Sequence, residues 1–89
     1  MSLREILSDI HTLEEDILAF ERKYGIRSET FYAAYVSGEG PDDDSWVLDF
    51  GEWASVYRTW LARQAEYRHA VQRIQRHAPS LAGLIRVTT

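Results

Sequence analysis

The sequence predicts an all-α protein, an antiparallel hairpin of two long coiled-coil-like helices with a short helix at the bend. Apolar residues recur at alternating steps of three and four over residues 3–24 and again, interrupted only by the polar Gln64, over residues 46–78. Turn-forming residues, among them Gly40 and Pro41, lie between these stretches. Because 89 residues are close to the lower limit for one stable core, we expect the hairpin to dimerise into a helical bundle.

The first long helix is predicted over residues 2–24. Ser2 and Glu5 have the spacing of a capping box, and Gly25 stands where a left-handed residue ends a helix. A stripe with a period of 3.5 residues is typical of helices that pack along each other. Its apolar positions are Leu3, Ile6, Ile10, Leu13, Ile17, Phe20 and Tyr24.

The segment after Gly25 predicts a short helix and then a loop. Ser28 is the expected N-cap of the short helix, which ends near Gly38. The loop is rich in glycine and aspartate, and either Asp44 or Ser45 is expected to cap the helix that follows.

The second long helix is predicted to run to His77 and to stop before Pro79. Its start is open, because Gly51 weakens the first turn and the helix could begin near that residue. With ten seam positions against seven in the first helix, one end overhangs, and we expect a second chain to cover it. The ten positions are Trp46, Phe50, Trp53, Tyr57, Trp60, Gln64, Tyr67, Val71, Ile74 and Ala78.

Residues 1–78 are therefore assigned to the helical hairpin domain and residues 79–89 to a C-terminal tail. The sequence Leu-Ile-Arg-Val-Thr-Thr over residues 84–89 is rich in β-branched side chains. We expect this tail to be either a frayed terminus or a strand that pairs with another molecule.

Charge is divided unevenly along the chain. Residues 1–56 contain four Lys/Arg and thirteen Asp/Glu, whereas residues 57–89 contain six Arg and one Glu. Such a division indicates either internal charge pairing or two different partner surfaces. No apolar run is long enough to cross a bilayer and cysteine is absent, so we expect a cytoplasmic protein that does not bind membranes.

No pattern of residues indicates catalysis, and we expect the protein not to be an enzyme. The acids at residues 42–44 lack the spacing of a calcium loop, and no two of the three histidines are four residues apart. The serines lie outside nucleophile-turn motifs, and no glycine-rich phosphate loop is present. We therefore expect no catalytic residue, no metal site and no cofactor.

The aromatic line of the second long helix and the apolar tail are the predicted partner-binding residues. Most of the aromatic line is expected to form core, with part of it facing a partner, since Trp and Tyr dominate interface hot spots. The predicted set is Trp46, Phe50, Trp53, Tyr57, Trp60, Tyr67, Leu84, Ile85 and Val87.

Five arginines between Arg58 and Arg76 offer an alternative function, a nucleic-acid-binding accessory protein. The simpler explanation is charge pairing with the acidic first helix and a favourable position near a helix C-terminus. The acidic pI of 5.2 favours the simpler explanation. A purely structural oligomerising protein is the third possibility.

Two stretches of the chain resemble a family of small prokaryotic helical proteins that are thought to be antitoxins of type II toxin–antitoxin pairs. The stretches are LEEDILAFERKYGIRSETF at residues 13–31 and DDDSWVLDFGEWASVYRTWL at residues 42–61. The matching positions are Glu21, Lys23, Tyr24, Gly25, Ser28, Phe31, Glu52, Trp53 and Tyr57. The chain departs from the family pattern in two places: its second long helix is longer, and it has the tail at residues 79–89.

The resemblance implies that the chain binds and neutralises a small basic toxin resembling the TumE or RelE-like class. It also implies that the acidic front half covers a basic RNA-binding face of that toxin. With the expected homodimer, this makes an antitoxin-like protein-interaction module the first functional prediction.

Overall fold

The computed structural model describes residues 2–88, and this part of the chain is helical and contains no strand. It confirms the predicted all-α class. The helices are α1 (Leu3–Tyr24), α2 (Ser28–Val36), α3 (Val47–Gln75) and α4 (Leu81–Thr88), with a 3-10 turn, η1 (Asp44–Trp46), before α3. No helix in the described chain is both long enough and apolar enough to cross a membrane.

Helix α1 begins and ends where the sequence predicted. The Ser2 hydroxyl accepts a hydrogen bond from the backbone N–H of Glu5 at 3.2 Å and donates one to the Glu5 carboxylate at 3.1 Å, which satisfies an otherwise free donor of the first turn. At the other end, Gly25 has a φ of 75° and its N–H bonds to the carbonyl of Glu21 at 2.8 Å. This left-handed residue ends α1 and turns the backbone toward α2.

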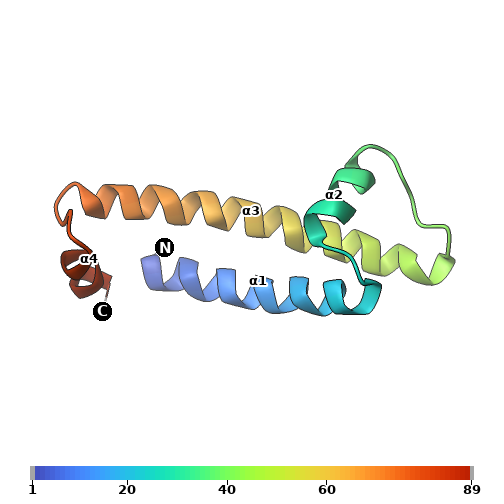
Figure 1. Ribbon diagram of the computed structural model, residues 1–89, viewed down its shortest axis with the longest axis horizontal. Coiled ribbons are helices and arrows are strands. Elements are labelled where there is room, and N and C mark those ends of the chain that lie inside the picture. The colour runs from blue at the N-terminus through green and yellow to red at the C-terminus, as the bar shows by residue number, and fades with distance from the viewer. Residues whose placement is uncertain (1, 89) are drawn as a thin grey trace.

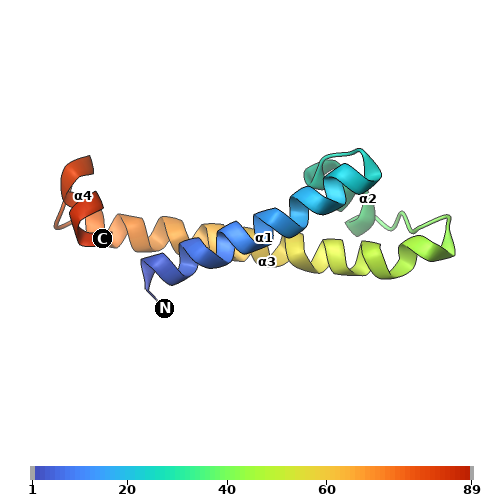
Figure 2. The ribbon, with the colours of Figure 1, turned by 90° about the horizontal axis from the view of Figure 1, so that it is seen from below.

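Helices α1 and α3 lie side by side and run in opposite directions (Figure 1). Figure 2 shows that α1 crosses α3 at an angle. One cluster of buried residues lies at each end: Ile6 and Ile10 pack against Ala70, whereas Phe31 packs against Trp53 and Ala54. The core is therefore divided into an aliphatic end and an aromatic end.

The second long helix begins before Gly51, which settles where it starts. Asp43 is the cap of η1, since its carboxylate accepts hydrogen bonds from the N–H and the hydroxyl of Ser45, at 2.9 Å and 2.7 Å. The predicted caps, Asp44 and Ser45, lie inside the turn. Helix α3 then starts at Val47 and passes through Gly51 without interruption, because the backbone entropy lost by one glycine costs only about 1 kcal/mol in a long helix that packs on α1.

The prediction for the tail is wrong: Leu81–Thr88 forms helix α4, neither a strand nor a frayed end. The Ser80 side chain accepts a hydrogen bond from the N–H of Gly83 at 3.0 Å, and its carbonyl accepts one from Leu84 at 3.0 Å. Arg4 of α1 donates from Nε to the carbonyl of Thr88 at 2.7 Å. An N-cap and tertiary contacts outweigh the β-branched composition here. Thr89, the last residue of the predicted tail, lies outside the described residues.

Helix α4 also changes the expectation for the overhang of α3. It lies beside the N-terminus of α1 and the last turns of α3 (Figure 1), so the same chain covers part of the surface for which we expected a second chain. The whole molecule is a rod of 51 × 22 × 20 Å. The aromatic core, α2 and η1 form one end of this rod, and α4 forms the other.

Candidate protein-binding surfaces

Trp53, one of the predicted partner-binding residues, lies in the interior. It is 0% exposed, and its ring stacks on Phe31 at 3.9 Å and on Phe20 at 5.6 Å between ring centroids. Its indole N–H donates to the hydroxyl of Ser28 at 2.8 Å. Because every part of this side chain is used inside the fold, Trp53 organises the aromatic core and contacts no partner in this conformation.

Ser28, the predicted cap of α2, has a different role. It is the first residue of α2 and is itself buried. Its N–H donates to the Glu21 carboxylate at 2.8 Å, so the side chain of Glu21 caps the helix from α1. Burial raises the pKa of Glu21, but the hydrogen bonds from Ser28 and the charge of Arg27 together hold this pKa below its ordinary value.

A second junction ties α1 to the start of α3. Lys23 and Tyr24 both donate to the same oxygen of Asp49, each at 2.6 Å. The hydrogen bond from Lys23, and then that from Tyr24, lower the pKa of Asp49, while the bond to Asp49 raises the pKa of both donors. Lys23 also lies 5.6 Å from the centroid of the Tyr24 ring.

These contacts give a structural role to most of the residues that carry the antitoxin resemblance. Glu21, Gly25 and Ser28 fix the turn between α1 and α2, while Lys23 and Tyr24 hold α3. Phe31 and Trp53 are core. Folding alone therefore explains why these residue types occur at this spacing.

One candidate surface is an acidic and aromatic pocket of about 270 Å³ at the middle of the rod. Tyr57 and Trp60 of α3 supply its aromatic rings, which stack at 5.6 Å between centroids. Leu18, 45% exposed, supplies an aliphatic wall. The pocket is lined by Glu14, Ile17, Leu18, Glu21, Arg27, Ser28, Glu29, Tyr57 and Trp60, and we call it the acidic pocket.

Three carboxylates against one guanidinium give the acidic pocket its character. Glu14 accepts a hydrogen bond from the indole N–H of Trp60 at 3.2 Å. Burial, followed by the negative charges of Glu29 and Glu21, raises the pKa of Tyr57, as expected where negative potential discourages a further anion. Carboxylates next to aromatic faces are suited to an arginine or lysine side chain.

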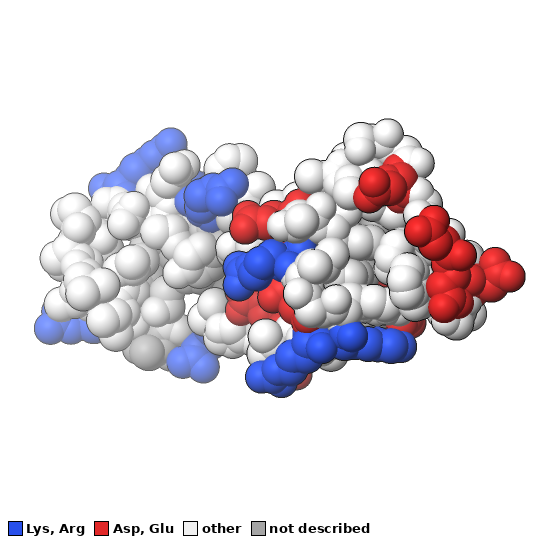
Figure 3. Space-filling view, turned by 45° about the vertical axis from the view of Figure 1, so that its right-hand side comes forward, with Lys and Arg blue, Asp and Glu red and all other residues white. Residues whose placement is uncertain are grey.

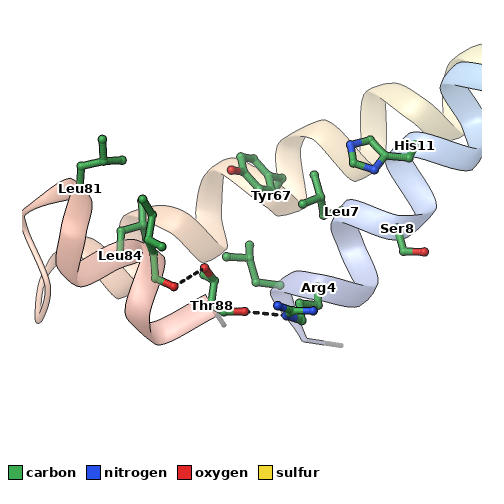
Figure 4. Close-up of a pocket in the computed structure, with 10 residues that line it drawn as sticks. Arg4, Leu7, Ser8, His11, Tyr67, Leu81, Leu84 and Thr88 are labelled. Atoms are coloured by element: carbon green, nitrogen blue, oxygen red, sulfur yellow. Dashed lines mark hydrogen bonds between the residues drawn. The ribbon is translucent and has the colours of Figure 1, made fainter.

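A second candidate surface is an apolar groove of about 520 Å³ at the α4 end of the rod. Leu7 and His11 come from α1, Tyr67 from α3, and Leu81 and Leu84 from α4 (Figure 4). Arg4 and Thr88, which also line it, are joined by the hydrogen bond from Arg4. This surface, which we call the apolar groove, is lined by Leu3, Arg4, Leu7, Ser8, His11, Tyr67, Leu81, Leu84, Ile85 and Thr88.

The structure thus distributes the nine predicted partner-binding residues over several places. Tyr57 and Trp60 line the acidic pocket, and Tyr67, Leu84 and Ile85 line the apolar groove. Val87 lies in a separate hollow beside Ile74 and Ala78. Phe50 packs on the aromatic core, and Trp46 stands at its edge, 37% exposed.

Sequence reasoning missed Glu14, Leu18 and Glu29 of the acidic pocket, and Leu7 and His11 of the groove. A signal was present for some of them: Glu14 and Glu21, seven residues apart, lie on one face of α1 beside the seam position Ile17. Glu29 comes close only because the chain turns back after Gly25, and spacing along the sequence does not show which residues meet across that turn.

The predicted arginine face is divided between internal and external roles. Arg63 bonds to Asp9 at 3.3 Å and to Glu66 at 3.0 Å, and Arg58 donates to the Tyr32 hydroxyl at 3.2 Å. Arg68, Arg73 and Arg76 are exposed, and no ion pair forms on them within residues 2–88. Charge pairing with α1, the simpler explanation, therefore accounts for Arg63.

Residues 2–88 contain no group of three or more His, Asp or Glu side chains arranged to hold a metal ion. No model of a protein family, no curated protein and no solved structure matches this chain. The antitoxin resemblance therefore rests on the short motifs of residues 13–31 and 42–61 alone.

Proposed function

We propose that this chain is a non-enzymatic protein-interaction module that binds a small basic protein, as an antitoxin does. The observation that carries the proposal is the acidic pocket, where Glu14, Glu21 and Glu29 surround the rings of Tyr57 and Trp60. An arginine entering this pocket would pair with a carboxylate and lie against an aromatic face, and both interactions favour arginine over neutral side chains.

The distribution of charge supports a basic partner. Residues 12–62, which form the half of the rod with the acidic pocket, contain eleven acids and four bases. On the face shown in Figure 3, the acidic side chains gather toward the end with α2, while the charged side chains at the opposite end are arginines. A field of this kind steers a positively charged protein to the acidic half before any close contact forms.

The experiment is a search of the neighbouring reading frames for a small basic protein, followed by its co-expression with this chain. Under the proposal, that protein is toxic when expressed alone, and this chain binds it and restores growth. Replacing Glu14 and Glu29 by glutamine removes two charges from the pocket, and we expect binding to weaken by about tenfold or more.

A matched control keeps the net charge of that variant. Glu15→Gln with Asp16→Asn also removes two charges, from exposed positions of α1 that do not line the pocket. We expect this control to bind nearly as well as the natural sequence. Equal loss in both variants would mean that only net charge matters, and no complex with the neighbouring protein would overturn the proposal.

The basic end of the rod supports a second candidate, nucleic-acid binding. Arg68, Arg73 and Arg76 are exposed there and make no ion pair within residues 2–88. Phosphate contacts of this kind give an affinity that falls steeply with salt. A gel shift with RNA or DNA that is lost in the triple Arg→Gln variant would favour this function over the first.

We further propose that the hairpin acts as a homodimer. The support is the amount of apolar surface that one chain leaves open, including Leu81 at 73% exposed and Leu48 at 85% exposed. A small domain that exposes this much apolar surface is stabilised when a second molecule covers it.

A further inference from the structure

The apolar groove has the form of a docking site whose occupant is absent from residues 2–88. It is a cavity of about 520 Å³ where α4 meets α1 and α3 (Figure 4). Leu7, Leu81 and Ile85 on its walls are 39%, 73% and 52% exposed. An apolar hollow of this kind loses its contact with water when an apolar segment fills it.

The charge around the groove indicates what kind of segment fits. The end of the rod that carries it is formed by residues 2–11 and 63–88, which contain six arginines and three acids. Arg4 lies in the groove itself. A segment that combines exposed apolar side chains with negative charge would complement both properties of this surface.

The chain carries such a segment at its other end. Trp46, Val47 and Leu48 are 37%, 52% and 85% exposed, and Leu48 is the most exposed large apolar side chain of the described residues. Asp42, Asp43 and Asp44 precede them in the sequence, and Asp49 and Glu52 follow. We call residues 42–48 the acidic tip.

We propose that the acidic tip of one chain docks in the apolar groove of a second copy, in an antiparallel dimer. A chain cannot fill its own groove, because tip and groove lie at opposite ends of a rod 51 Å long. When two rods lie antiparallel, each basic end meets an acidic end, and the two identical contacts close the dimer. The inference rests on the proposed homodimer and specifies its contacts.

The absence of cysteine in the natural chain makes a direct test possible. Leu48→Cys and Ile85→Cys are made separately, and the two proteins are mixed and oxidised. We expect the mixed disulfide between them to form in many times the yield of either protein with itself, because identical positions lie far apart in an antiparallel pair. Both side chains are more than half exposed, so neither change disturbs the fold.

Leu61→Cys is the matched control for Leu48→Cys. Leu61 is also on α3 and exposed, at 42%, but lines neither surface. Mixed with Ile85→Cys, it is expected to give little disulfide. Equal yields from Leu61→Cys and Leu48→Cys would overturn the proposed contacts.

Light scattering of the natural chain and of Leu48→Ala completes the test. We expect the natural chain to have the mass of a dimer, and Leu48→Ala to dissociate at a concentration at least about tenfold higher. Moderate salt should also weaken the dimer, because exposed charges are screened. A monomeric natural chain would overturn both the dimer and its contacts, whereas a dimer with unchanged affinity in Leu48→Ala would overturn the contacts alone.

Discussion

The indole N–H of Trp53 donates to the hydroxyl of Ser28 at 2.8 Å, in a position where both residues are buried. This hydrogen bond joins the middle of the aromatic core to the first residue of α2. Since no water reaches the pair, the indole N–H depends on the Ser28 hydroxyl for its hydrogen bond. The position of α2 on α3 thus depends on one polar contact as well as on stacked rings.

Ser28→Ala leaves the buried indole N–H without an acceptor. We expect the free energy of unfolding to fall by about 1–3 kcal/mol, measured by urea denaturation. Ser37→Ala is the control, because Ser37 is exposed and bonds only to the carbonyl of Ala34; we expect a change within about 0.5 kcal/mol. A loss in Ser28→Ala no larger than in Ser37→Ala would show that the buried bond contributes nothing.

Glu21, on α1, caps α2 through its carboxylate. Two substitutions separate the contribution of its negative charge to stability from that of its hydrogen-bond acceptor. Glu21→Ala removes the acceptor for the N–H of Ser28, and we expect a loss of about 1 kcal/mol. Glu21→Gln keeps an oxygen at that place and should lose less. Hydrogen exchange of the α2 amides reports the difference locally. If the two variants were equally destabilised, the charge and not the cap would be what matters.

The ion pair of Asp49 makes the free energy of unfolding depend on pH in the acidic range. Its folded-state pKa is lowered by Lys23 and Tyr24, so its contribution is present above the unfolded-state pKa and is lost as pH falls through the folded-state value. We expect the free energy of unfolding to decrease below about pH 4, and Asp49→Asn to show a smaller decrease there. Asp42→Asn removes one charge from the neighbouring loop as a control. Parallel pH profiles for the natural chain and Asp49→Asn would contradict this prediction.

Replacing glycine by alanine is expected to change the free energy of unfolding in opposite directions at Gly25 and at Gly51. Gly25 has a φ of 75°, and a Cβ there would meet no atom within 4 Å, so Gly25→Ala costs backbone strain alone, about 1–2 kcal/mol. Gly51 lies inside α3 with equally open space, and Gly51→Ala should stabilise by about 0.5–1 kcal/mol. Thermal unfolding distinguishes the two. A destabilising Gly51→Ala would mean that this turn of α3 is not helical in solution.

The sequence predicted what depends on local rules. The period of the apolar residues predicted α1 and α3, and Ser2 and Gly25 marked the ends of α1 because capping needs only neighbours in the chain. The partner of Ser28 lies 25 residues away in Trp53, so its burial was not visible in the spacing. For the same reason the seam could not show that Trp53 is core whereas Tyr57 and Trp60 reach a pocket surface.

The C-terminal helix was missed because its stability is tertiary. Eight residues are too few for a stable helix alone, and α4 depends on the Ser80 cap and on contacts with α1, including the bond from Arg4 to Thr88 at 2.7 Å.

Ser80→Ala removes the side-chain cap of α4, which contributes about 1 kcal/mol. This loss corresponds to about a fivefold larger undocked population of α4. Hydrogen exchange should therefore become faster in the α4 amides while protection in the middle of α3 stays unchanged. Ser2→Ala is the control, because it removes the corresponding cap from α1. We expect it to lower protection from exchange in the first turn of α1. A loss of protection in α4 of this variant would show how far an effect spreads from α1 to α4. Unchanged exchange of α4 in Ser80→Ala would show that docking alone holds this helix.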